Sequence, residues 1–243
     1  MNDDAAPGTA QEVPLQRLLR SIAARERSAV AQMLVESPSL ARQAIDVGAT
    51  RADESPYYFE QITRFIYAGD TPLHIAAAAY ETNIAEELVS RGAPVRARNR
   101  RGAEPLHYAV DGTPGSDAWD SEAQYDIVEF LIQAGANPNA TDNSGVAPLH
   151  RAVRTRCAPA VRALLMNEAD ALRKNKRGST PLHLAIQNTG RGGTGSAAAR
   201  EAQQEIIQLL LSHGARLSDK NAAGRSVQEC VTSDCIRALL SQM

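Results

Sequence analysis

The stretch Gly69-Asp70-Thr71-Pro72-Leu73-His74-Ile75-Ala76-Ala77 decides the fold, because the chain repeats it. Edited copies begin at Gly102, Gly145 and Gly178, so successive copies start 33, 43 and 33 residues apart. A fifth, degenerate copy begins at Gly224, a further 46 residues on. Self-similarity at such a period is typical of stacked units that bury their apolar faces against one another. We therefore expect one elongated solenoid and not two separate globular domains.

The composition fits an array of closely packed helices. Apolar residues make up 43 % of the chain, and many of them are Ala and Leu, which favour helices. The net charge of −2 gives the whole chain no general attraction to nucleic acid or membranes. The odd number of cysteines (Cys157, Cys230 and Cys235), without a C-x-x-C pair, implies no disulfide framework and suits a reducing compartment.

No targeting or membrane segment is visible. Residues 1–11 are polar and acidic, so they lack the apolar core of a signal peptide, and we expect them to be disordered. No apolar run approaches the roughly 18 residues that a membrane span requires. These features predict a soluble intracellular protein, located in the cytoplasm, with no membrane partner.

Each unit predicts two helices followed by a polar arm. In the first unit Thr71 can cap the first helix and Pro72 suits its first position. The second helix ends at Gly92, since glycine readily takes the left-handed conformation found at helix ends. The arm, residues 94–101, leads to the next copy. In the third unit Ala169 stands where we expect that glycine, which predicts a tighter or strained turn.

Two insertions break the period at the same place in the unit. They occupy residues 111–120 of the second unit and residues near 188–200 of the fourth, between the two helices of each. The flanking helical patterns are intact. We therefore expect two loops on one edge of the array.

The ends of the chain lack the repeated stretch. Residues 12–68 predict a helical cap, with helices over 13–24 and 30–35, a short one over 40–45, and an aromatic-rich helix over 57–67. At the other end, Ser226 and Glu229 form an S-x-x-E capping box, and a last helix begins at Asp234. The expected units are 1–11, 12–68, 69–101, 102–144, 145–177, 178–223 and 224–243.

The pattern G-x-T-P-L-H-x-A-A, followed by V-x-x-L-L-x-x-G-A-x-x-N, resembles the ankyrin repeat, and four copies cover residues 69–222. The resemblance implies an all-α solenoid of helix–loop–helix units with β-turn arms. It also implies a concave face, formed by arms and first helices, that binds protein partners without catalysis. The sequence departs from the motif at Glu104 and Ala147, which replace Thr, and at Tyr80, which replaces Gly.

The four motif histidines suggest a metal site only at first sight. Zinc would need nitrogens about 2.0–2.1 Å from one ion, whereas equivalent residues of stacked units lie roughly 8–10 Å apart. We interpret each histidine as tying its turn to the next unit by hydrogen bonds, and we predict no metal. These residues are His74, His107, His150 and His183.

Two further motifs have ordinary explanations. Gly190, Gly192 and Gly195 match the spacing of a dinucleotide fingerprint but follow a predicted helix, not a strand, so we interpret them as an inserted loop. An anion at the helix N-terminus after this loop stays an alternative. Cys157 is interpreted as a partly buried thiol. We predict no cofactor and no catalytic residue.

Arginines gather on the arms and first helices. One alternative is a solvated surface; the other is a basic groove for an acidic protein segment or a phosphate-bearing ligand. Nucleic acid is disfavoured because aromatic residues do not interleave with the arginines. Trp119 either folds back over its unit or meets a partner. The predicted partner-binding residues are Arg98, Arg100, Arg101, Tyr108, Trp119, Arg151, Arg154, Arg156, Lys174 and Arg177.

The leading functional hypothesis is a monomeric, non-catalytic scaffold that binds another protein, through an acidic segment, on the concave face. The alternative is a ligand-gated regulator or enzyme that uses the inserted loops. Those loops offer Asp111, Asp117, Asp120, Glu122 and Arg191, but no nucleophile paired with a base.

Overall fold

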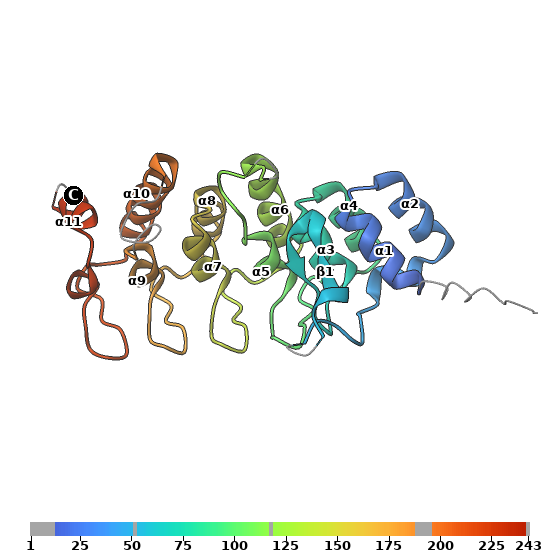
Figure 1. The fold of residues 1–243 in the computed structure, drawn as a ribbon, viewed down its shortest axis with the longest axis horizontal. Coiled ribbons are helices and arrows are strands. Elements are labelled where there is room, and N and C mark those ends of the chain that lie inside the picture. Colours follow the sequence, from blue (N-terminus) through green and yellow to red (C-terminus); the bar gives the residue numbers. More distant parts are fainter. Residues whose placement is uncertain (1–12, 51–52, 117–118, 188–195, 242–243) are drawn as a thin grey trace, which may run out of the picture.

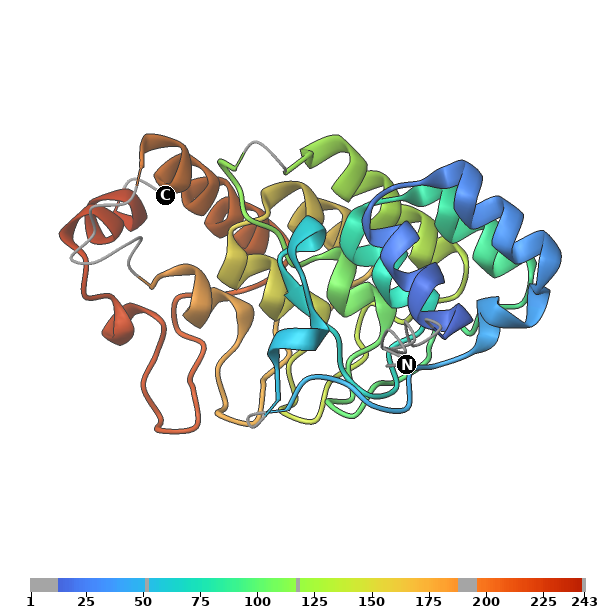
Figure 2. The same cartoon turned by 45° about the vertical axis from the view of Figure 1, so that its right-hand side comes forward.

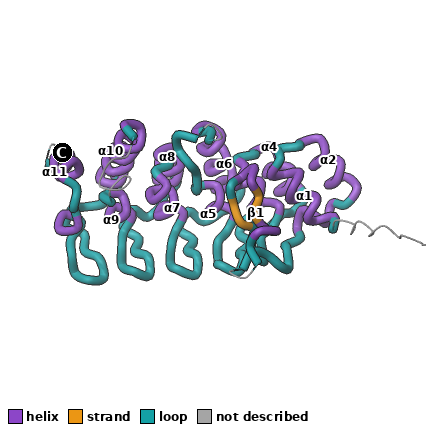
Figure 3. The backbone as a smooth tube through the Cα atoms, in the orientation of Figure 1, coloured by secondary structure: helices purple, strands orange, loops and turns teal. Residues whose placement is uncertain are grey.

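The computed structural model describes residues 13–50, 53–116, 119–187 and 196–241. Pairs of helices stack side by side in one row, and the arms project from the same side of the row (Figure 1). Figure 3 shows these arms as a series of loops below the helices. The segment 1–11 and the loop with Gly190, Gly192 and Gly195 lie outside the described residues.

Each helix pair has a first helix beside the arms and a second helix on the far side. The first helices are α1 (Pro14–Ala23), α3 (Pro72–Ala79), α5 (Pro105–Ala109), α7 (Pro148–Thr155) and α9 (Pro181–Ala185). The second helices are α2 (Arg27–Glu36), α4 (Thr82–Ser90), α6 (Ser121–Gln133), α8 (Ala158–Met166) and α10 (Ala197–Ser212). The row ends with α11 (Asp234–Leu240), which begins where the sequence predicts.

The motif histidines tie neighbouring units together, as predicted. The Thr71 N–H donates to Nδ1 of His74 at 3.1 Å, so Nε2 carries the proton and donates to the Ala103 carbonyl of the next unit at 3.2 Å. The other three histidines repeat the pattern, with Nε2 donating to the carbonyls of Val146 (His107, 3.2 Å), Ser179 (His150, 3.2 Å) and Arg225 (His183, 3.4 Å). Both ring nitrogens are therefore occupied by the protein.

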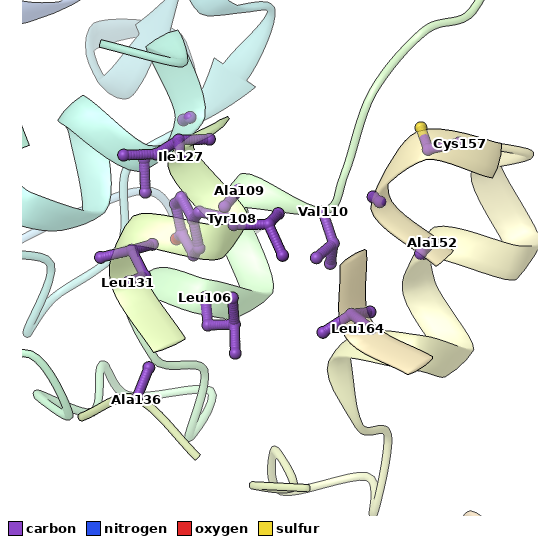
Figure 4. Packing of buried hydrophobic residues seen from close by; sticks show 14 of the residues in the cluster. Leu106, Tyr108, Ala109, Val110, Ile127, Leu131, Ala136, Ala152, Cys157 and Leu164 are labelled. Atoms are coloured by element: carbon purple, nitrogen blue, oxygen red, sulfur yellow. The ribbon is translucent and has the colours of Figure 1, made fainter. Parts of the chain in front are cut away.

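The core runs continuously along the row. Figure 4 shows Leu106 and Tyr108 of α5 packed with Ile127 and Leu131 of α6, while Val110 reaches toward Leu164 in the next unit. All eight residues of α3 are buried, which its run of four alanines permits because small side chains allow close helix packing. Each unit thus buries apolar surface on both of its neighbours.

The turn after α8 corrects one prediction. Glu168, and not Ala169, occupies the position of the helix-ending glycine, with φ of +62°, in the same place as Gly92 at +85°. The Ala169 N–H then donates to the Leu164 carbonyl at 3.0 Å, as Ala93 does to Leu88 in the first unit at 2.9 Å. The strain predicted for this turn therefore falls on Glu168, because left-handed φ is unfavourable for residues with a Cβ.

Each insertion ends at a capped second helix, but the helix after the second insertion begins earlier than expected. In the second unit, Asp120 caps α6 by accepting from the N–H groups of Glu122 and Ala123, both at 3.0 Å. In the fourth unit, Ser196 caps α10 by accepting from the Ala199 N–H at 3.2 Å. Residues 197–200, expected in a loop, therefore belong to a second helix longer than those of the other units.

The N-terminal cap corrects a larger prediction. Residues 57–67 do not form a helix: β1 (Tyr58–Phe59) and β2 (Arg64–Phe65) pair antiparallel around a short 3-10 helix, Glu60–Ile62. Thr63 makes the turn possible with φ of +47°. Aromatic and β-branched residues suit strands as well as a helical period, so periodicity alone could not decide. The expected helix over 40–45 is also only a 3-10 turn, Pro38–Arg42.

We name residues 58–65 the first-arm hairpin. It belongs to the arm between the cap and the first full unit, and it stands in front of the middle of the row (Figure 2), where Arg64 contacts Asp111 and the Tyr108 ring. At the other end of the chain, the predicted capping box is present: the Ser226 N–H and hydroxyl both donate to Oε2 of Glu229, at 2.7 and 2.9 Å. Within the described ranges no helix is long and apolar enough to cross a membrane.

Candidate partner-binding groove

The arms and first helices enclose a groove of about 640 Å³, which we name the inner groove. The first-arm hairpin closes one side of it. Of the predicted partner-binding residues, the groove brings together Arg101, Tyr108, Arg151, Arg154 and Arg177. All its charged lining residues are Arg64, Arg101, Asp111, Asp142, Arg151, Arg154 and Arg177, which leaves a net charge of +3.

A chain of ion pairs forms the floor of the inner groove. Arg151 donates from Nη1 to Oδ2 of Asp111 at 3.1 Å and from Nη2 to Oδ2 of Asp142 at 2.9 Å. Arg64 of the hairpin donates to the same oxygen of Asp111 at 3.1 Å. Side chains of these residues are between 10 % and 21 % exposed, so the pairs are largely shielded from water.

The pKa values of the floor residues agree with this geometry. Burial would raise the pKa of Asp142, but the Arg151 hydrogen bond and the backbone N–H groups of Val146 and Ser144 outweigh it and lower that pKa. Burial would likewise lower the pKa of Arg151, yet Asp111 and Asp142 raise it. Both partners are therefore charged at neutral pH and fixed in position.

Tyr108 borders the inner groove, but its side chain is almost fully buried. It is 2 % exposed, its hydroxyl donates to Oδ2 of Asp70 at 2.8 Å, and it accepts from Nδ2 of Asn99 at 3.0 Å. The Arg64 guanidinium lies over its ring at 4.6 Å. The prediction of Tyr108 as a contact residue is thus corrected, because the hairpin that covers it was not foreseen.

Three arginines of the inner groove are exposed and have no carboxylate partner among the residues that the structure describes. Arg101 donates to the Tyr67 hydroxyl at 2.8 Å. The side chains of Arg154 and Arg177 form no hydrogen bond or ion pair within the part of the chain that the structure describes. Arg101 ends the arm of the first unit, and Arg154 and Arg177 belong to the first helix and the arm of the third unit, so exposed positive charge spans the groove.

A family model of ankyrin repeats (three copies) matches this chain twice, over residues 21–142 and 117–221. The chain belongs to the ankyrin repeat family. Modules of this family are generally protein–protein interaction modules, and the helical solenoid agrees with that membership. A search of curated proteins found no similar sequence.

The remaining predicted arginines lie outside the inner groove of this ankyrin repeat protein. Arg98 donates to the Thr141 carbonyl at 2.9 Å and lies 3.7 Å from the buried carboxylate of Glu104. Arg100 donates to the Ala49 carbonyl and lies over the Tyr67 ring at 5.2 Å. These two side chains therefore join one arm to its neighbours.

Arg156 and Lys174 also lie away from the groove. Arg156 ends α7 with φ of +59°, and its guanidinium donates to the Gln187 carbonyl at 3.4 Å. Burial lowers the pKa of Arg156. Lys174 is exposed on its arm. Neither residue lines the inner groove.

Trp119 folds back over its own unit. Its indole N–H donates to Oε1 of Gln124 at 3.1 Å, and Nε2 of Gln124 donates to the Ala109 carbonyl at 3.0 Å. Tyr80, left-handed at φ of +57° where the repeat has glycine, donates from its hydroxyl to the Asp111 carbonyl at 2.6 Å. The inserted loop is thus anchored at both of its ends.

The site contains residues that sequence reasoning missed. Arg64 fell within the expected cap helix over 57–67, and Asp142 was not considered. Asp111 was considered only as a loop acid for the enzyme alternative. The signal for Asp142 is its place in the arm, where its other oxygen accepts from the N–H groups of Ser144 and Val146, at 2.8 and 3.0 Å.

The chemistry of the other candidate groups is modest. Burial raises the pKa of Cys157 to about 11, so its thiol is protonated at neutral pH and is a poor nucleophile. Among the described residues, no group of three or more His, Cys, Asp or Glu side chains could hold a metal ion.

Proposed function

We propose that the chain is a non-catalytic scaffold whose inner groove binds an acidic segment of a partner protein. The observation that carries this proposal is the set of exposed guanidinium groups on Arg101, Arg154 and Arg177, which have no carboxylate partner in the described ranges. Carboxylates on an extended segment would supply those partners through charge-assisted hydrogen bonds.

The preformed floor of the groove lowers the entropy cost of binding. Arg64, Asp111, Arg151 and Asp142 already hold one another, so they need no reordering when a partner arrives. Both carboxylates of the floor accept hydrogen bonds from arginines, which gives them a structural role in the groove. This arrangement favours binding over catalysis.

The test uses a fluorescein-labelled oligoglutamate peptide, with oligolysine as the opposite charge, in an anisotropy titration. We expect oligoglutamate to bind, oligolysine not to bind, and affinity to fall with added salt. A triple variant, Arg101→Glu with Arg154→Glu and Arg177→Glu, is expected to weaken binding by more than about tenfold, since opposing charges become like charges.

The matched control carries the same change in net charge elsewhere. Arg17, Arg42 and Arg216 are exposed and do not line the inner groove. Changing these three residues to Glu is expected to leave most of the affinity intact. Equal losses in both triple variants would show that net charge alone attracts the peptide, and would refute the groove as the site.

A further inference from the structure

A second pocket, of about 390 Å³, lies between the first-arm hairpin and the inserted loop of the second unit. We name it the insert pocket. Its lining includes Thr63, which also lines the inner groove, and four residues that do not: Arg25, Thr113, Ser116 and Trp119. Its volume falls in the range of small-molecule sites, roughly 300–1,000 Å³. Neither the hairpin nor the loop belongs to the regular ankyrin repeat, so the pocket is a feature of this chain.

The insert pocket carries excess positive charge. Three arginines, Arg25, Arg64 and Arg154, line it against a single carboxylate, that of Asp111. That carboxylate already accepts from Arg64 and, on the groove side, from Arg151.

Two of these arginines, Arg25 and Arg154, are available to a ligand. Arg154 forms no hydrogen bond or ion pair with any residue in the described ranges. Arg25 lies 3.9 Å from Glu81, whose other oxygen already accepts from Arg27 at 2.8 Å. An anion in the insert pocket would therefore meet two guanidinium groups that need not first break a close ion pair.

Hydroxyl groups complete the set of donors. The side chains of Thr63, Thr113 and Ser116 line the pocket and make no hydrogen bond with the described residues. A phosphate monoester carries about −1.5 to −2 charges and three acceptor oxygens at neutral pH. It matches several guanidinium and hydroxyl donors better than a carboxylate does, which has one charge and two oxygens.

The pocket is larger than a phosphate group alone requires. Trp119 is half-buried at its wall, and its indole N–H is held by Gln124 at 3.1 Å, so the ring is fixed. Ile62 adds an apolar surface. These side chains could pack against the organic part of a ligand. We propose that the insert pocket binds a phosphate monoester, with its phosphate near Arg25 and Arg154.

Trp119 provides a direct readout, because it is the only tryptophan of the chain. Its emission is followed while the protein is titrated with AMP, O-phospho-L-tyrosine or inorganic phosphate, with adenosine and tyrosine as unphosphorylated controls. Isothermal titration calorimetry of the same mixtures measures binding that does not alter emission. We expect saturable binding of a phosphate monoester, at least about tenfold tighter than its unphosphorylated control.

The two monoesters distinguish the source of the phosphate. Tighter binding of AMP would indicate a free nucleotide, and tighter binding of O-phospho-L-tyrosine a phosphorylated protein side chain. Either result supports the proposal. The absence of saturable heat and emission change with every phosphate compound would overturn it, as would equal affinity for the unphosphorylated controls.

Three variants locate the site. Arg25 lines the insert pocket alone, Arg177 lines the inner groove alone, and Arg154 lines both. Arg25→Gln is expected to weaken phosphate binding about tenfold, and Arg177→Gln to leave it unchanged. Arg154→Gln, which removes no hydrogen bond or ion pair within the described residues, is expected to weaken phosphate binding while the protein stays folded. Phosphate binding that survives both Arg25→Gln and Arg154→Gln would refute this site.

Discussion

Arg64 and Asp111 meet at 3.1 Å although 47 residues separate them in the sequence. The contact joins the first-arm hairpin to the inserted loop of the second unit, and the same Asp111 oxygen also accepts from Arg151 of α7 at 3.1 Å. Two segments that the regular repeat lacks are thereby fixed to a third unit. Two of the four floor residues, Arg64 and Asp111, are therefore supplied by departures from the repeat.

Removal of the Asp111 carboxylate tests this floor. Asp111→Ala leaves two largely buried arginines without a shared partner, so we expect the free energy of unfolding to fall by about 3 kcal/mol. Urea unfolding followed by circular dichroism measures the change. Asp126→Ala, at an exposed position of α6, is the matched control and is expected to change stability by less than about 0.5 kcal/mol. Equal effects of the two substitutions would mean that the ion pairs contribute nothing.

The stability of the row should depend on pH through its buried histidines. Burial, with Arg151 nearby, lowers the pKa of His107 from 6.5 to about 4. His107 is therefore protonated below pH 6.5 in the unfolded chain but only below about pH 4 in the native chain. The contribution of neutral His107 to the free energy of unfolding is fully present above pH 6.5. It falls on acidification and is reduced by on the order of 3 kcal/mol at pH 4.

A comparison of variants isolates this contribution. Burial raises the pKa of Glu104, which favours the native state as the pH falls and opposes the histidine effect. We therefore compare urea midpoints between pH 7 and pH 4 for the native sequence, His107→Gln and His213→Gln. We expect a shallower pH dependence in His107→Gln and an unchanged one at the exposed His213. Identical slopes in all three proteins would contradict the assignment.

The strained turn after α8 should be open to improvement. Glu168 has φ of +62° and an exposed side chain. Glu168→Gly removes the unfavourable Cβ contact, and we expect stabilisation of roughly 0.5–1 kcal/mol. Glu168→Ala is the control, since it deletes the same charge but retains a Cβ. Thermal unfolding would refute the explanation if alanine stabilised the protein as much as glycine.

Gln124 should anchor the inserted loop. It is fully buried, and its loss leaves the Ala109 carbonyl and the Trp119 indole N–H without their partner. We expect Gln124→Ala to destabilise the protein by about 2 kcal/mol and to shift the Trp119 emission to longer wavelength. Gln133→Ala, exposed at the end of the same helix, should do neither. An unchanged emission spectrum in Gln124→Ala would show that Trp119 does not depend on this contact.

The repeated units could be predicted because their information is local. Pro72, His74 and Gly102 occupy positions whose backbone requirements recur in each copy, and the structure confirms the histidine ties that their spacing implies. Cap boundaries such as Asp234 were similarly accessible through short-range capping chemistry.

The candidate site was harder to predict from the sequence because its contacts join residues far apart in the chain. Residues 57–67 satisfy a helical period, and only the pairing of Tyr58 with Phe65 shows that they form a hairpin. Because this segment was predicted as a helix, the contact of Arg64 with Asp111 could not be foreseen. For the same reason Tyr108 was predicted at the surface, although the hairpin covers it. The exposure of Arg101, Arg154 and Arg177 could be foreseen because charge on an arm or first helix needs no such match, and their role in binding stays a prediction.

Hydrogen–deuterium exchange with and without oligoglutamate is the most direct test of the inner groove. The account predicts slower exchange in the arms, at residues 99–102, 142–145 and 175–178, with the outer helices α4, α6 and α8 unchanged. Protection confined to those outer helices, or protection that persists in the Arg101→Glu, Arg154→Glu, Arg177→Glu variant, would contradict it.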